Sequence, residues 1–200
     1  MSNRGSLFLR IIPFFARPYG RIRQWFLINA LLEVHRKSRN MGAISKLLAE
    51  ASFSETCLIL TAMGARLGAR SYIENHLFIH NARNDYSNLT IGQNAYVGKD
   101  CFLDLSDKIT IGDNAVVAMR ATILTHFDGG NSTISQRKSP FTKPVHVQSG
   151  AYVGAGAILM PGVTICEGTV VAPGAVVEED SIVQGMYGGI PAKPIRVFRN

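Results

Sequence analysis

A six-residue period governs the last part of the sequence. Aliphatic residues recur at every sixth position from Val147 to Val183, and small residues or glycines fill most of the positions between them. A period of six fits neither the 3.6-residue turn of an α-helix nor the two-residue alternation of a β-strand. It indicates that one short strand and one sharp turn repeat many times, and it predicts an all-β chain, a parallel β-helix built from hexapeptides.

The same frame starts far upstream. It begins at Leu67, shifts by two residues after Leu103 and resumes at Ile111. Sixteen of the seventeen frame positions are Ile, Leu or Val; these types make up 48 of the 200 residues, so about four would be expected by chance. Asp85 is the exception, and we expect a bulge or a polar turn around it. Three hexapeptides complete one triangular turn, so about six turns are expected.

Three segments are predicted. Residues 1–56 form a basic, mostly helical segment with helices over about 21–37 and 42–51, which caps the open strand edge of the first turn. Residues 57–188 form the β-helix, and residues 189–200 form a C-terminal tail. The frame is interrupted between Ile123 and Val147, which predicts a protruding loop over about 126–145. Long loops on compact scaffolds usually carry function.

Charge is concentrated at the start of the chain. Residues 1–50 contain nine basic and two acidic residues, whereas residues 51–200 contain twelve of each. A nucleic-acid-binding protein carries basic charge on its main binding face, so the neutral repeat argues against a nucleic-acid partner. Residues 1–40 either pack on the β-helix and its neighbours or lie on an anionic membrane surface as a peripheral contact.

Location is predicted from what the sequence lacks. No stretch reaches the roughly 20 apolar residues of a transmembrane helix, and no cleavage site follows the N-terminal apolar segment. The three cysteines are scattered, which favours free thiols in a reducing compartment. We therefore expect a cytoplasmic protein, held at the inner face of the cell membrane if residues 1–40 bind it.

Three motifs besides the repeat identify a family resemblance. They are Ile111–Asn114 leading to Ile123–His126 directly before the loop, the run Leu159–Ile165, and the exit Gly188–Arg196. With them, residues 58–197 resemble the left-handed parallel β-helix acyltransferases of the hexapeptide-repeat family, which include maltose, galactoside and serine acetyltransferases and many polysaccharide O-acetyltransferases. The resemblance implies an acyl-CoA-dependent transferase that forms a homotrimer with active sites between subunits.

The resemblance assigns the catalytic base to His126. A neutral imidazole can take the proton from a hydroxyl as it attacks the thioester of acetyl-CoA, without a covalent acyl-enzyme. Either Asp104 or Asp128 could orient the imidazole through its other ring nitrogen, and the sequence leaves both open. An asparagine that lines the site in sugar acetyltransferases falls here on Gly98, so the acceptor site departs from the family pattern.

The resemblance also implies a donor site for acetyl-CoA. Backbone groups of Ala155 and Pro173 would contact the pantetheine arm, and Lys193 and Arg196 would bind the phosphates. Glu178–Glu179 occupy the place where relatives often carry Thr-Lys, so this part of the donor site differs in kind.

No metal is expected. The zinc site of the γ-class carbonic anhydrases, which share this kind of fold, needs three histidines, two of them five residues apart. His76 and His80 are four apart, and His146 has no near partner. His76 and His80 either line the acceptor groove or face solvent.

Three functions follow from these observations. The first is an O-acetyltransferase that moves an acetyl group from acetyl-CoA to a saccharide hydroxyl, for example in a surface-polysaccharide precursor. The second is an amino-sugar N-acetyltransferase, and the third is a non-catalytic β-helix that serves as a scaffold or binding module.

Overall fold

The N-terminal end of the β-helix is covered by two short helices. The computed structural model describes residues 26, 30, 33 and 41–198, so the predicted helix over 21–37 and the role of residues 1–40 lie almost wholly outside the described residues. α2 (Met41–Glu50) corresponds to the second predicted helix, and α3 (Phe53–Ala62) follows it. Ser52 and Glu55 form a capping box at the start of α3. α3 spans the predicted boundary at residues 56 and 57, and the strands begin at Arg66.

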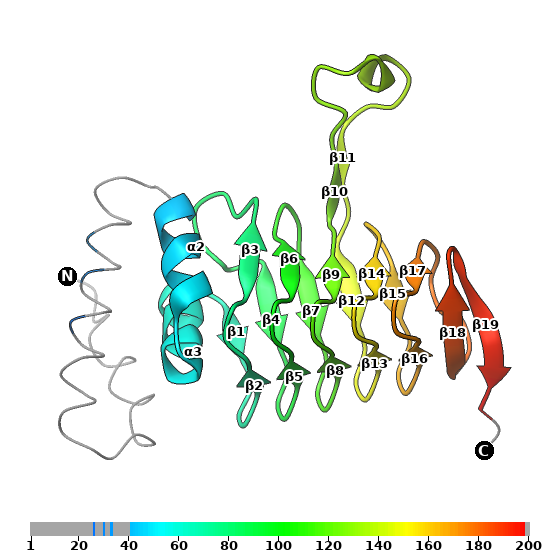
Figure 1. The fold of residues 1–200 in the computed structure, drawn as a ribbon, viewed down its shortest axis with the longest axis horizontal. Coiled ribbons are helices and arrows are strands. Elements are labelled where there is room, and N and C mark those ends of the chain that lie inside the picture. Colours follow the sequence, from blue (N-terminus) through cyan, green and yellow to red (C-terminus); the bar gives the residue numbers. More distant parts are fainter. Residues whose placement is uncertain (1–25, 27–29, 31–32, 34–40, 199–200) are drawn as a thin grey trace, which may run out of the picture.

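Short parallel strands stack into three faces of a prism (Figure 1). The first face consists of β1 (Arg66–Leu67), β4 (Leu89–Ile91), β7 (Ile109–Ile111), β12 (Val145–Val147) and β15 (Thr164–Ile165). The second face consists of β2 (Tyr72–Ile73), β5 (Tyr96–Val97), β8 (Val116–Val117), β13 (Tyr152–Val153), β16 (Val170–Val171), β18 (Gly185–Gly189) and β19 (Ala192–Val197). The third face consists of β3 (Phe78–His80), β6 (Phe102–Asp104), β9 (Thr122–Ile123), β14 (Ile158–Leu159) and β17 (Val176–Val177).

The aliphatic frame forms the core of a left-handed parallel β-helix. Its residues stack in register along each face; on the second face, for example, Ile73 pairs with Val97 and Val97 with Val117. These side chains are fully buried, and each contributes roughly 1.5–3 kcal/mol through removal from water. The predicted frame is wrong at one end, because Val183 lies in a bend and is 42% exposed. Tyr187 on β18 takes the next place in the stack, opposite Val171.

Two of the three corners of the prism are regular. Four residues link each strand of the first face to the second, and four link each strand of the second face to the third, from β1 to β17. Each of these corners contains one residue with positive φ. Before residue 126 these are non-glycine residues, and after it they are glycines: Arg70, His76, Asn94, Asp100, Asn114 and Arg120, then Gly150, Gly156, Gly168 and Gly174.

The third corner, from the third face back to the first, receives every extra residue. Here the frame residues are twelve apart from Ile79 to Ile91, eight apart from Leu103 to Ile111, and twenty-four apart from Ile123 to Val147, instead of six. We call this edge, residues 80–88, 104–108 and 124–144, the insertion corner. Asp85 fell on the predicted frame because the first insertion adds six residues, one whole repeat, and it lies in an irregular segment with its carboxylate accepting the Ser87 N–H.

The predicted loop is an arm with its own strands. β10 (His126–Phe127) and β11 (Phe141–Thr142) pair antiparallel, with His126 opposite Thr142 and Phe127 opposite Phe141. A short 3-10 helix, η2 (Thr133–Gln136), forms the tip, which projects away from the prism in Figure 1. The rings of Phe127 and Phe141 stack with centroids 5.7 Å apart.

The C-terminal residues close the other end of the prism. After β17 the chain crosses the first face without a strand, and β18 then pairs antiparallel with β19. Residues 192–197, predicted as a tail, are therefore a strand of the second face. Among the described residues, no helix has the length and apolar character needed to cross a membrane.

Candidate active site

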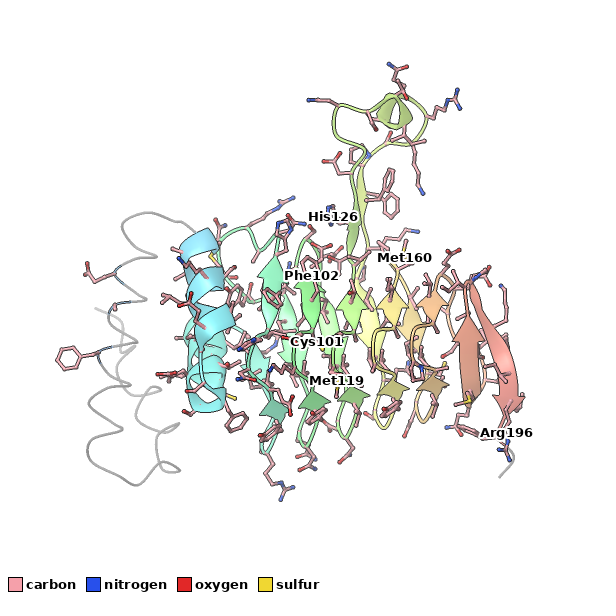
Figure 2. All side chains as sticks on the ribbon, viewed as in Figure 1. Cys101, Phe102, Met119, His126, Met160 and Arg196 are labelled. Carbon is pink, nitrogen blue, oxygen red and sulfur yellow. The ribbon has the colours of Figure 1, made fainter. Side chains whose placement is uncertain are left out.

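Three successive insertions bring polar side chains together at the insertion corner. Asn81 follows β3, Asp104 ends β6, and His126 begins the arm after β9. Register places them in line, because His80 pairs with Asp104 and Leu103 pairs with Ile123. Figure 2 shows His126 at the base of the arm, on the same edge of the prism as Met160.

Asp104 is the centre of this cluster. Its side chain is completely buried, and its Oδ2 lies 2.6 Å from Nδ1 of His126. The same oxygen accepts the Thr125 N–H at 2.8 Å, and Oδ1 accepts bonds from Asn81 Nδ2 at 2.9 Å and Ser106 Oγ at 3.0 Å. A carboxylate is an acceptor only, and its lone pairs are here met by donors.

These contacts fix the charge of Asp104. Burial on its own would raise the pKa of the carboxyl, but hydrogen bonds from His126, Thr125 and Asn81 and the charge of His126 together lower the pKa to about 2. The group is therefore ionised at neutral pH and accepts rather than donates. His126 must then carry its proton on Nδ1, which leaves the lone pair of the neutral imidazole on Nε2. This is the tautomer that a general base requires.

Asn81 is a member of the cluster that the sequence did not single out. It has a φ of +56° and directly follows the last residue of β3. Its amide nitrogen also lies 3.4 Å and 3.5 Å from the two ring nitrogens of His126, longer than its 2.9 Å bond to Asp104. The sequence feature that could have identified Asn81 is its residue type, because asparagine tolerates positive φ at the end of a strand better than most residues.

Beside His126 the surface is hollowed. The hollow has a volume of about 500 Å³ and lies between the first insertion and the arm. Its lining residues are Asn81, Arg83, Ser106, His126, Phe127, Asp128, Pro140, Phe141 and Thr142. His126 is 34% exposed here, so its imidazole is open to a small molecule in the hollow. A volume of this size fits a small-molecule site with a few converging polar groups.

The two predicted partners of His126 have separate positions. Asp104 contacts the imidazole directly. Asp128 is exposed on the arm, and its Oδ1 accepts the Gly130 N–H at 2.8 Å. Asp128 therefore shapes the turn that starts the arm, and of the two residues Asp104 has the geometry of an orienting partner.

The four predicted donor residues lie on a different part of the prism. Ala155 and Pro173 occupy neighbouring turns of the regular corner between the second and third faces, where the Gly174 N–H donates to the Ala155 carbonyl at 2.9 Å. Lys193 and Arg196 are exposed on β19, and Lys193 Nζ lies 3.0 Å from Glu179 Oε2. In Figure 2 Arg196 and His126 are on opposite sides of the molecule. Within one chain the donor residues and His126 do not meet.

Gly98 also lies at the regular corner. A Cβ atom at this position would be 2.6 Å from the Met119 nitrogen, so no side chain fits there. The amide group beside His126 comes from Asn81 instead. His76 Nδ1 is 3.5 Å from Asp100 Oδ1, the rings of His80 and Phe102 form a tilted pair with centroids 5.9 Å apart, and His146 is on the first face. No group of three metal-ligating side chains occurs within residues 41–198.

Two family models match the repeat. The model described as the bacterial transferase hexapeptide matches residues 144–179, and the model of the hexapeptide repeat of succinyl-transferase matches residues 88–123. No curated protein matches the sequence.

Solved structures share the fold. A maltose O-acetyltransferase from Clostridium difficile superposes with a TM-score of 0.67 at 22% identity, over 84% of this chain and 90% of that chain. A hexapeptide-repeat acetyltransferase from Vibrio cholerae, complexed with acetyl-CoA, superposes with a TM-score of 0.70 at 20% identity, over 84% of this chain and 89% of that chain. A mutant N-acyltransferase from Bacillus cereus was solved with dTDP-4-amino-4,6-dideoxyglucose and coenzyme A. It superposes with a TM-score of 0.54 at 21% identity, over 68% of this chain and 79% of that chain. The chain contains hexapeptide repeats and has the left-handed parallel β-helix fold of these solved structures.

Proposed function

We propose that the protein is an O-acetyltransferase that uses acetyl-CoA as co-substrate and a saccharide hydroxyl as acceptor. The observation that carries this proposal is the 2.6 Å contact between His126 Nδ1 and the buried, ionised Asp104, beside an open hollow of about 500 Å³. The acetyl-CoA and sugar chemistry of the structural neighbours supports it.

In this mechanism His126 is the general base. An acceptor hydroxyl in the hollow attacks the thioester carbonyl while Nε2 takes its proton, and the resulting imidazolium is stabilised by Asp104. Collapse of the tetrahedral intermediate breaks the carbon–sulfur bond and releases the CoA thiolate, which receives the proton. Asp104 acts through His126, so it is a positioning residue rather than a catalytic one.

The separation of His126 from the donor residues supports a site shared between copies. We propose a homotrimer in which Ala155 and Pro173 of one chain face the insertion corner of the next, with Lys193 and Arg196 near the CoA phosphates. Light scattering should give a mass of three chains. Mixed trimers of His126→Ala and Arg196→Glu chains should recover activity that neither parent has if the site is shared.

An amino-sugar N-acetyltransferase is the second candidate. The Bacillus cereus N-acyltransferase, whose complex holds an amino sugar nucleotide, favours it. Its lower TM-score and smaller coverage make it the weaker support. Hydroxylamine distinguishes the two products, because it cleaves an O-acetyl ester and leaves an N-acetyl amide intact.

The basic segment suggests where the enzyme works. We propose that residues 1–40 hold it at the anionic inner face of the cell membrane, where surface-polysaccharide precursors are assembled. The intact chain should sediment with vesicles that contain anionic lipid, and a chain lacking residues 1–40 should stay in the supernatant. Equal sedimentation of both chains would contradict this location.

The central test is acetyl transfer. Purified protein, acetyl-CoA and a panel of hydroxyl-bearing and amino-bearing sugars should release CoA and give an acetylated sugar detectable by mass spectrometry. CoA release no faster than in the absence of sugar, with no acetylated product from any acceptor, would instead favour a non-catalytic scaffold or binding module.

A further inference from the structure

One of the side chains that line the hollow beside His126 is a cation with no partner among the described residues. Arg83 lies in the first insertion, two residues after Asn81, and is exposed. Within residues 41–198 its guanidinium has no hydrogen bond and no ion pair. A guanidinium is planar and always charged, and it matches the two oxygens of a carboxylate or phosphate. An unpaired Arg in a pocket is therefore suited to an anionic group on a ligand.

The arm above the hollow adds positive charge. Lys138 Nζ lies over the rings of Phe127 and Phe141, 4.8 Å and 5.1 Å from their centroids, and Lys143 Nζ lies 5.6 Å from the Phe141 centroid. The rings hold these ammonium groups without neutralising them. Neither lysine has a carboxylate partner in the part of the chain that the structure describes.

The charge is specific to this region. The arm, residues 126–143, contains three basic residues and one acidic residue, while the rest of the described chain, residues 41–125 and 144–198, contains nine basic and twelve acidic residues. The acidic residue is Asp128, the one carboxylate that lines the hollow, and its Oδ1 is engaged with the Gly130 N–H. The buried carboxylate below, Asp104, is surrounded by donors from four residues: Asn81, Ser106, Thr125 and His126.

The rest of the lining suits a sugar ring. Phe127 and Phe141 provide an apolar wall, against which the C–H face of a pyranose can pack. Hydroxyl and amide groups of Ser106, Thr142 and Asn81 lie around the same hollow. A mainly apolar wall with a few converging polar groups is the usual construction of a small-molecule site. The unpaired cation is the feature that an anionic sugar would use more strongly than a neutral one, because its contact with a carboxylate or phosphate is charge-assisted and bidentate.

We propose that the acceptor is a saccharide carrying a phosphate or carboxylate group, which Arg83 binds while the sugar ring packs on Phe127 and Phe141. The arm cations raise the local concentration of such anions. The acetyl-accepting role of this ligand rests on the proposed function, but its binding does not. Arg83 is then a specificity-determining residue.

The phosphates of CoA are the competing occupant of Arg83. They are less favoured because two other cations, Lys193 and Arg196, are exposed on β19 and are assigned to those phosphates in the proposed trimer. An acetyl-CoA titration distinguishes the two occupants.

Titration calorimetry with three matched hexoses tests the proposal. D-glucose 1-phosphate and D-glucuronate provide the two anionic groups, and methyl glucoside is the neutral control. We expect the unaltered protein to bind at least one anionic sugar more tightly than methyl glucoside. Arg83→Gln should weaken that binding roughly ten- to hundredfold, the effect of a lost charge-assisted hydrogen bond. Binding of the neutral sugar should stay within about twofold.

Two further variants control for folding and for charge. Arg66→Gln removes an exposed arginine from the first face, outside the hollow, and should leave saccharide binding unchanged. Arg83→Lys keeps the charge and loses the planar fork, so it should fall between the unaltered protein and Arg83→Gln. The preference for phosphate or carboxylate identifies the anionic group.

The outcomes separate this proposal from the proposed function. Arg83-dependent binding of an anionic sugar without acetyl transfer would support the inference and contradict the enzyme. Transfer to methyl glucoside with the same kcat/KM as to the anionic sugars would support the enzyme and overturn the inference. Equal or absent binding of all three sugars, or a loss of acetyl-CoA affinity in Arg83→Gln, would also overturn it.

Discussion

The insertion corner and the regular corner between the second and third faces lie at the two edges of the same third face, yet they differ in the extra residues and side chains that they accommodate. At the regular corner, successive turns contact each other through backbone atoms, and a Cβ at Gly98 or Gly154 would lie within 2.6 Å or 2.5 Å of the next turn. At the insertion corner, extra residues carry side chains that cross from turn to turn. The repeat supplies rigidity at one corner, and departures from it place the proposed catalytic residues at the other.

The largest expected effect on activity comes from removing the proposed general base, His126. His126→Ala should lower kcat for acetyl transfer by roughly 10²–10⁴-fold, the usual contribution of a general base. His146→Ala, on the first face, is the matched control and should retain activity. Full activity in His126→Ala would refute the assignment of chemistry to the insertion corner.

Asp104→Asn should have the next largest effect. It removes the acceptor that fixes the Nδ1–H tautomer, so kcat should fall roughly a hundredfold or more, while Asp128→Asn changes kcat little.

The stability of the Asp104→Asn variant should change as well. The pKa of about 2 lies below the ordinary 3.8, so Asp104 stabilises the fold by ~2 kcal/mol above pH ~4, and this contribution disappears as the pH falls through ~2.

Acid unfolding measures that contribution. The unaltered protein should lose stability between pH ~4 and ~2, and Asp104→Asn should be less stable at neutral pH with a flatter profile over this range. Parallel profiles for the two proteins would show that Asp104 is not held ionised by its neighbours.

Glycines sharpen the comparison at the regular corner. Gly98→Ala should lower the free energy of unfolding by about 2–3 kcal/mol, because its Cβ would overlap the backbone nitrogen of Met119. Gly156→Ala has open space around its Cβ and a φ of +67°, so it should cost only about 1 kcal/mol. Denaturant titrations give both values, and equal costs would mean that close packing does not constrain this corner.

The smallest effect on stability is expected from the arm tip. Replacing residues 128–140 with Asn-Gly joins β10 to β11 by a two-residue hairpin turn and preserves the Phe127–Phe141 pair. The tip helix, residues 133–136, buries no side chain, so the free energy of unfolding should change by less than about 1 kcal/mol. A large loss of stability would mean that the arm supports the prism.

Most of the fold was predictable because the period leaves few alternatives. The aliphatic frame from Leu67 to Val177 is buried, apart from the partly buried Leu67 and the exposed Asp85. Val183 was misplaced because the frame does not reveal where the last complete turn ends. Asp85 matched the frame only by its spacing, since an insertion of six residues cannot be distinguished from one more hexapeptide.

The candidate site was less predictable because it depends on contacts between turns. His126 stood out through the motif before the loop. The choice between Asp104 and Asp128 required the register of β6 against β3 and β9, which sequence spacing does not give. Asn81 and Arg83 lie in an irregular segment with no periodic signal, so only their positions in space associate them with His126.

The change from non-glycine to glycine at the positive-φ positions has a thermal consequence. Before the arm, residues such as Arg70 and Asn94 adopt the left-handed backbone conformation. The resulting strain in the native state costs roughly 1–2 kcal/mol for each residue, and less for asparagine. After it, Gly150 and Gly168 adopt the same backbone without strain but lose more freedom on folding, by roughly 0.5–1 kcal/mol. An entropic cost grows with temperature and strain does not, so warming weakens the turns after the arm more than the turns before it.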